Sequence, residues 1–106
     1  MKIIIAGAGE VGTHSAKLLS REEQDIILID NDEEKLRELD ANYNLMTVIG
    51  NPTAFQTLKQ AQVYKADLFI AVMPFESRNI MACTMASKLG AKKNSGKSGQ
   101  LRIPFT

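Results

Sequence analysis

Three glycines near the start of the chain have the spacing of a phosphate-binding loop. Gly7, Gly9 and Gly12 form the pattern Gly-x-Gly-x-x-Gly between a short apolar run and a stretch with helical periodicity. In such loops the first glycine permits a tight turn, the second lets the backbone approach a pyrophosphate, and the third lets the helix pack closely on the strand. The amides of Glu10, Val11 and Gly12 would then point at the anion from the start of the helix.

An acidic residue lies where this loop would need a partner. Asp30 ends the second apolar run, 18 residues after Gly12, and a carboxylate there can accept hydrogen bonds from both hydroxyls of an adenosine ribose. It would repel a 2′-phosphate, and neither Asn31 nor Asp32 supplies a compensating cation. The sequence therefore predicts NAD, or another adenosine ligand with an unphosphorylated ribose, in preference to NADP. The alternative role of Asp30 is to cap the following helix.

Groups suited to acid–base or covalent catalysis are scarce in the sequence. A hydride-transfer enzyme needs a proton donor or acceptor beside the nicotinamide. The single histidine, His14, lies one turn into the first predicted helix, and the single cysteine, Cys83, is expected to be a small buried thiol. No cluster of histidine, cysteine and carboxylate has metal-ligand spacing. The sequence therefore predicts a binding protein with no catalytic residue and no metal site.

The elements that must position these residues alternate along the chain. Four short apolar runs, at 3–6, 26–29, 46–49 and 68–72, are nearly continuous in apolar character, which is typical of parallel strands buried on both faces. Helical patterns separate them, and the order predicts an α/β fold, a Rossmann-like doubly wound parallel sheet truncated after about four strands. The last predicted helix spans roughly 77–89, with packing residues Ile80, Met81, Thr84, Met85 and Leu89.

The composition is that of one small globular domain. The chain has 106 residues, of which 44% are hydrophobic and 24% charged, and no apolar run approaches the ~20 residues that span a bilayer. Four of the 13 basic residues lie after residue 91, so residues 1–91 hold nine basic and 12 acidic groups. That balance argues against a nucleic-acid partner. A single cysteine suits a reducing cytoplasm.

The composition changes at about residue 91. Residues 1–91 hold the alternating strands and helices, and residues 92–106 combine basic residues with a Ser-Gly composition that is typical of flexible linkers. We expect a Rossmann lobe over 1–91 followed by a flexible or unrelated tail over 92–106. The alternative is a short strand from Leu101 to Ile103 added to the edge of the sheet.

Several collinear stretches resemble one known family. They are MKIIIAGAGEVGTHSAKLL, DIILIDNDEEKLREL, GNPTAFQTLKQAQ, ADLFIAV and ESRNIMAC, and they resemble the nucleotide-binding lobe of Trk-type potassium uptake proteins, the RCK or KTN domain. The resemblance covers about residues 1–91. It implies a cytoplasmic regulator that binds NAD(H) or ATP/ADP and gates a membrane potassium-transporter subunit, staying peripheral at the inner face of the plasma membrane without inserting into it.

The resemblance also implies a homodimer or ring oligomer. In the last predicted helix, Ile80, Met81 and Met85 are more apolar side chains than one sheet face can cover, which supports self-association.

Residues of the nucleotide site follow from the same resemblance. The run 50–53 matches a Gly-Asp-Ala-Thr loop that borders the adenine, with Asn51 in place of the acid. Met73 stands where a threonine commonly follows the fourth strand, and Asn79 matches an asparagine that begins the last helix near the ligand. The full expected site is Gly7, Gly9, Glu10, Val11, Gly12, Asp30, Asn31, Asn51, Thr53, Met73, Arg78 and Asn79.

Glu10 bears on the choice of nucleotide. Relatives that prefer ATP tend to have an arginine at this loop position, whereas Glu10 would face a γ-phosphate with the wrong sign. The resemblance therefore favours NAD(H) over ATP/ADP. Arg78 could compensate from the opposite side of the ligand, and its alternative role is that of a solvated surface residue.

Three functions are compatible with the sequence. The first is a regulatory nucleotide-binding subunit or domain that controls a Trk-type potassium transporter and is not an enzyme. The second is the cofactor-binding half of an NAD-dependent dehydrogenase whose substrate domain is absent. The third is a structural lobe in which the Asn51 and Met73 changes have abolished binding. The lack of acid–base residues after the fourth predicted strand favours the first over the second.

Overall fold

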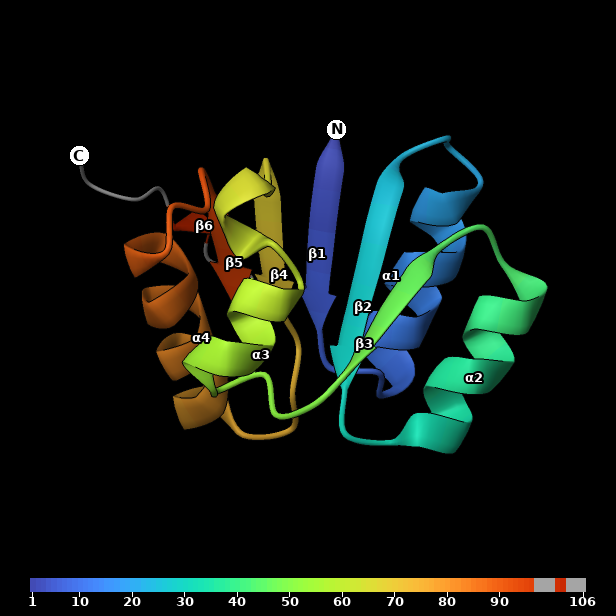
Figure 1. The fold of residues 1–106 in the computed structure, drawn as a ribbon, viewed down its shortest axis with the longest axis horizontal. Helices are drawn as coiled ribbons and strands as arrows, with labels where there is room; N and C mark the ends of the chain where they lie inside the picture. Colours follow the sequence, from blue (N-terminus) through green and yellow to red (C-terminus); the bar gives the residue numbers. More distant parts are fainter. Residues whose placement is uncertain (97–100, 103–106) are drawn as a thin grey trace.

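The computed structural model describes residues 1–96 and 101–102 as one sheet with helices on both faces (Figure 1). The strands lie in the order β3-β2-β1-β4-β5-β6. They are parallel except for the antiparallel pairing of β6 with β5. The elements are, in chain order, β1 (Lys2–Ala6), α1 (Glu10–Ser20), β2 (Asp25–Asp30), α2 (Glu33–Asn42), β3 (Met46–Ile49), α3 (Phe55–Gln60), the 3-10 turn η1 (Val63–Lys65), β4 (Leu68–Ala71), α4 (Glu76–Lys88), β5 (Asn94–Gly96) and β6 (Leu101–Arg102).

All four predicted strands are present, with ends that differ from the expected ones by at most one residue. The predicted α/β fold, a Rossmann-like doubly wound parallel sheet, is confirmed. Two short strands follow the four: β5 pairs with β4, and β6 pairs with β5. The alternative edge strand was expected from Leu101 to Ile103; β6 holds Leu101 and Arg102, and Ile103 lies outside the described residues.

Successive strand residues alternate between two hydrophobic layers, which explains the continuous apolar runs. On the face covered by α3 and α4, Ile4, Ile27 and Phe69 pack into one cluster. On the face covered by α1 and α2, Ile3, Ile5 and Leu28 pack into the other. Figure 1 shows the two pairs of helices on opposite sides of the sheet. Because both faces are buried, neither can carry the polar half of an alternating pattern.

The register brings the carboxyl ends of three strands together. Ala6, the last residue of β1, is paired with Ile29 of β2 on one side and with Ala71 of β4 on the other. The segments that follow β1, β2 and β4 therefore emerge side by side. In open α/β sheets this is the edge where ligands bind, at the point where the strand order reverses.

The face that helix α4 presents to the sheet is only partly the one expected. Its buried residues are Asn79, Ala82, Cys83 and Ala86. Ile80 and Met81, expected to pack, are 41% and 53% exposed, and Thr84 is exposed as well. The prediction was right for Met85 and Leu89, which are half-buried and pack against the cluster on this face, and wrong for Ile80, Met81 and Thr84. The fully buried residues of the helix are mostly small, which lets it lie close to the strands.

At the amino end of the sheet, Asp67 joins the starts of β1 and β4. Its Oδ2 accepts a hydrogen bond from the backbone N–H of Lys2 (2.8 Å), and its Oδ1 pairs with Lys92 Nζ (3.1 Å). The hydrogen bond from Lys2, followed by that from Lys92, holds the pKa of Asp67 below its ordinary value of 3.8.

This contact predicts an acid-dependent contribution to stability. Because the folded-state pKa of Asp67 is lowered, its ionised form stabilises the fold above pH 3.8, and this contribution is lost as the pH falls through the folded-state pKa. Asp67→Asn should therefore lower the Tm at neutral pH, and the Tm difference from wild type should close as both proteins are brought to about pH 2. Thermal denaturation across this range tests it, and a difference independent of pH would contradict it.

Candidate functional site

The glycine loop leads from β1 to α1, and two of its glycines are required by the fold itself. Gly7 has a φ of +113°, a conformation that residues with a Cβ rarely adopt, and its N–H donates to the carbonyl oxygen of Ile29 (2.8 Å). Gly12 lies against the same turn: a Cβ there would collide with the carbonyl oxygen of Gly7. These two glycines would be needed whether or not the loop held a ligand.

Gly9 has no such structural reason. Its φ of −75° and ψ of −164° are extended backbone that any residue can adopt, and a Cβ built there meets nothing within 4 Å. The space beside this backbone is open at the start of α1. That is what a close approach of a ligand to the second glycine requires.

The start of α1 offers backbone donors to an anion. The first intrahelical hydrogen bond runs from the Thr13 N–H to the carbonyl oxygen of Gly9 (2.9 Å). The amides of Glu10, Val11 and Gly12 precede it and therefore have no intrahelical acceptor. They lie at the positive end of the helix dipole. The Glu10 side chain is exposed in this first turn and adds a negative charge beside the same amides.

Asp30 holds the glycine loop against β2. The Ala8 N–H donates to Asp30 Oδ2 (2.6 Å), and the Asp32 N–H donates to Asp30 Oδ1 (2.8 Å). Each carboxylate oxygen thus has a backbone donor and keeps further acceptor capacity for a ribose hydroxyl. The cap of α2 is Asp32, whose side chain accepts from the Lys35 N–H (3.1 Å). Asp30 supports the turn into this helix without being its cap.

The loop after β3 lies next to Asp30. The Gly50 N–H donates to the Asp30 carbonyl oxygen (3.0 Å). Asn51 Oδ1 then accepts from both the N–H (2.9 Å) and the hydroxyl (2.7 Å) of Thr53. The Asn51 side chain is exposed, as is that of Asn31 at the end of β2. The structure therefore brings three of the expected residues, Asn31, Asn51 and Thr53, to the Asp30 side of the glycine loop.

The loop after β4 is held by Asn79, whose side chain is only 1% exposed. Asn79 Oδ1 accepts from the Met73 N–H (2.7 Å), and Asn79 Nδ2 donates to the Met73 carbonyl oxygen (3.0 Å). Met73 in turn lies against the glycine loop, because its Cγ is 3.2 Å from the position that a Cβ on Gly7 would take. The asparagine expected near the ligand thus positions the segment that contacts Gly7.

Arg78 is exposed at the start of α4. Its guanidinium carbon lies 5.5 Å from the ring centroid of Phe75, a cation–π distance. Phe75 is itself 61% exposed. The two side chains form a stacked pair at the carboxyl edge of the sheet.

A groove of about 430 Å³ lies beside the glycine loop. Some of its lining residues are basic side chains that were not predicted to belong to the site. The groove is lined by Ala8, Gly9, Glu10, Thr13, His14, Lys17 and Lys35. Residues 10, 13, 14 and 17 have the spacing of one helix face, so this part was available from the sequence. Lys35 comes from α2, and only the packing of the two helices brings it to the same groove.

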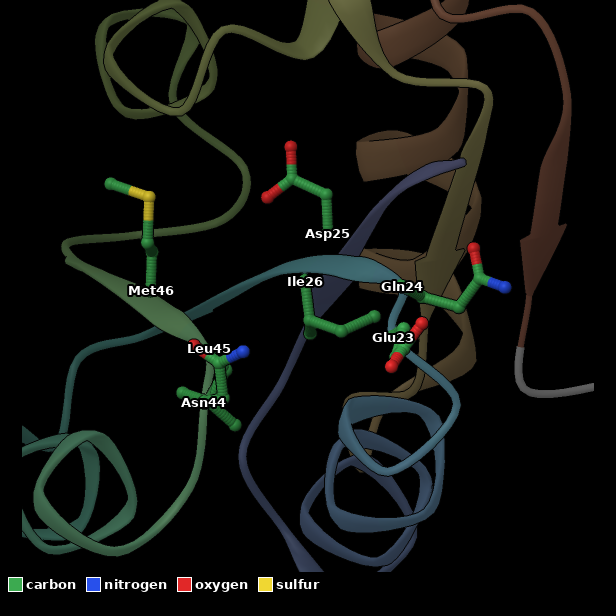
Figure 2. Close-up of a pocket in the computed structure, with 7 residues that line it drawn as sticks. All are labelled: Glu23, Gln24, Asp25, Ile26, Asn44, Leu45 and Met46. Carbon is green, nitrogen blue, oxygen red and sulfur yellow. The ribbon is translucent and has the colours of Figure 1, made fainter.

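A larger hollow of about 530 Å³ lies at the opposite end of the sheet. It is formed where β2 and β3 begin, and Figure 2 shows the side chains of Asp25 and Met46 extending from these two neighbouring strands. Its remaining lining residues are Glu23, Gln24, Ile26, Asn44 and Leu45. Ligands of open α/β sheets bind at the carboxyl ends of strands, so the smaller groove by the glycine loop is the candidate nucleotide site.

Within residues 1–96 and 101–102, no helix is long and apolar enough to cross a membrane. The same residues contain no group of three or more histidines, cysteines or carboxylates that could hold a metal ion.

Residues 3–95 match the family model of the TrkA-N domain. The chain belongs to the TrkA-N domain family. It is 44% identical over 89 residues to the Trk system potassium uptake protein TrkA of Halomonas elongata, and the match covers 84% of this chain but 20% of that protein. This TrkA-N domain therefore spans about a fifth of the length of that relative. The family match extends four residues past the boundary expected at residue 91.

Solved structures share the fold at low sequence identity. The TrkA-N domain of the inner membrane protein ybaL from Escherichia coli superposes with a TM-score of 0.83 and 17% identity, over 90% of this chain and 70% of that one. The GsuK channel bound to NAD superposes with a TM-score of 0.78 and 18% identity, over 90% of this chain and 17% of the channel chain. The anaerobilin reductase ChuY from Escherichia coli O157:H7 superposes with a TM-score of 0.71 and 13% identity, over 91% of this chain and 50% of the reductase chain. Since a reductase also shares it, the fold alone does not separate binding from catalysis.

Replacing Asp30 in this TrkA-N domain should affect both stability and binding. Asp30→Ala leaves the Ala8 N–H, which is partly buried, without its acceptor. We expect a loss of about 1–3 kcal/mol in the free energy of unfolding without ligand, and a loss on the order of 1–3 kcal/mol in nucleotide binding. Urea denaturation measures the first and calorimetry the second. If both the free energy of unfolding and the binding affinity were unchanged, Asp30 would have no role in holding the loop or in binding the nucleotide.

Proposed function

We propose that this TrkA-N domain is a regulatory module that binds an adenine nucleotide and controls a Trk-type potassium transporter. The observation that carries the proposal is the open backbone at Gly9, where a Cβ would meet nothing within 4 Å. Amides without an intrahelical acceptor begin α1 directly after Gly9, and the Asp30 carboxylate accepts from Ala8, the residue before Gly9. A pyrophosphate on the amides and a ribose on Asp30 use both groups at once.

Within that proposal, NAD(H) is the preferred ligand and ATP or ADP is the alternative. The Glu10 carboxylate, exposed in the first turn of α1, opposes a terminal phosphate more than it opposes the internal pyrophosphate of a dinucleotide. The solved GsuK channel was bound to NAD, which agrees with a dinucleotide in a related fold. Arg78, stacked on Phe75, is the group that would favour a triphosphate.

The remaining residues of the proposed site surround this ligand. Asn31, Asn51 and Thr53 border the adenine and ribose beside Asp30. Met73 and Asn79 form the opposite wall, where Asn79 fixes the backbone of Met73 and Met73 packs against Gly7.

Comparing two glycine variants separates ligand binding from folding. Gly9→Ala adds a methyl group in open space, so the free energy of unfolding should stay at the wild-type value or rise by about 0.4–1 kcal/mol. The same methyl group would stand where the pyrophosphate approaches, and NADH affinity should fall at least about tenfold in calorimetry. Gly12→Ala is the matched control: its methyl group collides with the carbonyl of Gly7 and should cost about 1–3 kcal/mol of stability. Wild-type affinity in Gly9→Ala would contradict the proposed ligand position.

The proposed partners are a membrane potassium-transporter subunit of the Trk type and further copies of this chain. Ile80 and Met81 on the solvent side of α4 are 41% and 53% exposed, so they are available for a homodimer or ring. We place the module in the cytoplasm, held at the inner face of the plasma membrane by its partner. We assign the nucleotide-binding lobe to residues 1–91, and β5 and β6 extend its sheet beyond that boundary. In sedimentation at tens of micromolar we expect a dimer or larger species, and a monomer at that concentration would contradict self-association.

A regulatory role requires that the nucleotide leave unchanged. A ligand shifts a conformational equilibrium by its different affinities for two states, and no chemical step is needed. In a full-length regulator carrying this domain, NADH should alter potassium flux through a reconstituted Trk-type transporter while the absorbance of NADH stays constant. Steady oxidation of NADH by a small carbonyl substrate at ~1 per second or faster would instead support the dehydrogenase half.

A further inference from the structure

Strand β3 is an edge of the sheet, and among the described strands it pairs with β2 alone. The N–H of Gly50, directly after the strand, donates to the Asp30 carbonyl oxygen of β2 (3.0 Å). Because the backbone groups of successive strand residues point to alternate sides, the N–H and C=O groups of Thr47 and Ile49 point away from β2. They can form a ladder with an added strand.

This edge lacks the features that usually prevent strand addition. Natural edge strands carry charged residues, proline or a bulge, whereas the four residues of β3 are Met-Thr-Val-Ile. Val48 packs against the cluster covered by α3 and α4, so Met46 lies on that face, and Thr47 and Ile49 lie on the α2 face. Met46 and Ile49 are 62% and 50% exposed. An added strand would therefore meet an exposed apolar side chain on each face.

The segment that forms this edge carries most of the negative charge of the chain. Residues 21–50 contain nine of the 12 acidic residues and three of the 13 basic ones. The formal charge of this segment is therefore −6, and that of the remaining residues is +7. Such an asymmetry attracts a basic partner to the β3 edge and repels an acidic one.

Helix α2 presents an acidic side chain on the flank away from α1. Glu33, Arg37 and Asp40 have the spacing of one helix face, whereas Lys35 lies on the other flank, where it lines the groove with α1. Arg37 pairs with Glu33 (3.0 Å). Asp40 is exposed, and no described residue forms an ion pair with it.

The hollow at the amino ends of β2 and β3 continues this acidic edge. Its charged lining residues, Glu23 and Asp25, are both acidic, and Figure 2 shows Asp25 and Met46 extending from the two neighbouring strands. Lys2 is the register neighbour of Asp25 on β1 and offsets one of these charges, although its Nζ donates to Gln62 (3.4 Å). Acidic groups therefore flank β3 at its amino end as well as along α2.

We propose that β3 is a docking edge for an extended basic segment of the membrane partner, which adds to the sheet as an antiparallel strand. This inference rests on the proposed function, because it takes the transporter subunit as the partner. Membrane proteins carry an excess of Lys and Arg in their cytoplasmic loops, so such a subunit offers segments of the required charge. Basic residues of the segment would lie opposite Thr47 and Ile49 on the α2 face, and apolar residues between them would cover Met46.

The test is fluorescence anisotropy of the full chain with synthetic peptides of alternating lysine and valine. In an antiparallel ladder, peptide residues opposite Thr47 and Ile49 exchange hydrogen bonds with them and share their face, so the lysine N–H groups should point at β3. N-methylation of the lysine backbone should therefore weaken binding at least about tenfold. N-methylation of the valines is the matched control and should leave the affinity unchanged. A peptide of alternating glutamate and valine should not bind.

Variants of the chain test the same edge from the other side. Thr47→Pro removes an outward N–H and keeps the ladder to β2, because proline is tolerated on edge strands, and it should weaken lysine-peptide binding at least about tenfold. Asp40→Asn should weaken it roughly twofold to fivefold, the range of an exposed ion pair. Glu76→Gln, at the start of α4, is the matched control and should change nothing. All three variants should bind NADH like wild type.

The outcomes separate the docking edge from the function on which it rests. Equal binding of the two N-methylated peptides overturns the added strand, because charge alone would then explain the attraction. A dimer in sedimentation that Thr47→Pro dissociates also overturns it, since a second copy would then occupy β3. If NADH binds and the lysine peptide does not, the docking edge falls and the proposed function stands. If the peptides bind in the expected pattern and no nucleotide binds, the edge stands and the proposed nucleotide function falls.

Discussion

The hydrogen bond from the Ala8 N–H to the Asp30 carboxylate is the contact on which the arrangement of the site depends. It spans 2.6 Å and joins the segments that leave β1 and β2, whose ends are already in register through Ala6 and Ile29. The same carboxylate also receives the N–H of Asp32 as the chain turns into α2. The glycine loop, Asp30 and the second helix are therefore one connected unit. A charge-assisted hydrogen bond of this kind fixes geometry more firmly than a neutral one.

The three glycines of the loop show that one pattern can have two causes. The fold requires glycine at positions 7 and 12. Gly7 has a positive φ, and a Cβ on Gly12 would collide with the carbonyl oxygen of Gly7. Neither reason applies to Gly9, because its backbone is extended and the space around its Cα is open. The sequence pattern alone cannot distinguish a glycine required by the fold from a glycine that leaves room for a ligand, because the residue type is the same in both cases. Only the space around each Cα separates a packing requirement from room for a ligand.

Much of the fold could be predicted because a strand that is buried on both faces appears in the sequence as a continuous apolar run. The runs that became β1 to β4 were located to within one residue at each end. Cys83 was expected to be buried and is buried, but the rest of the buried face of α4 could not be found in this way. Ala82 and Ala86 carry less hydrophobic signal than the exposed Ile80 and Met81. Lys35 could not be assigned to the groove either, since its neighbours there come from a helix more than 15 residues earlier. Contacts between elements depend on packing distances that periodicity within one element does not contain.

The buried amide of Asn79 has a mechanical consequence. It makes two hydrogen bonds to the backbone of Met73, and separating them inside the protein would leave polar groups without partners, at a cost of about 1–3 kcal/mol each. The segment after β4 is therefore tied to the first turns of α4. Met73 contacts Gly7 at one end of this connection, and Ile80 and Met81 are exposed on the helix at the other. Moving Met73 away from Gly7 would strain both hydrogen bonds unless the start of α4 moved with it.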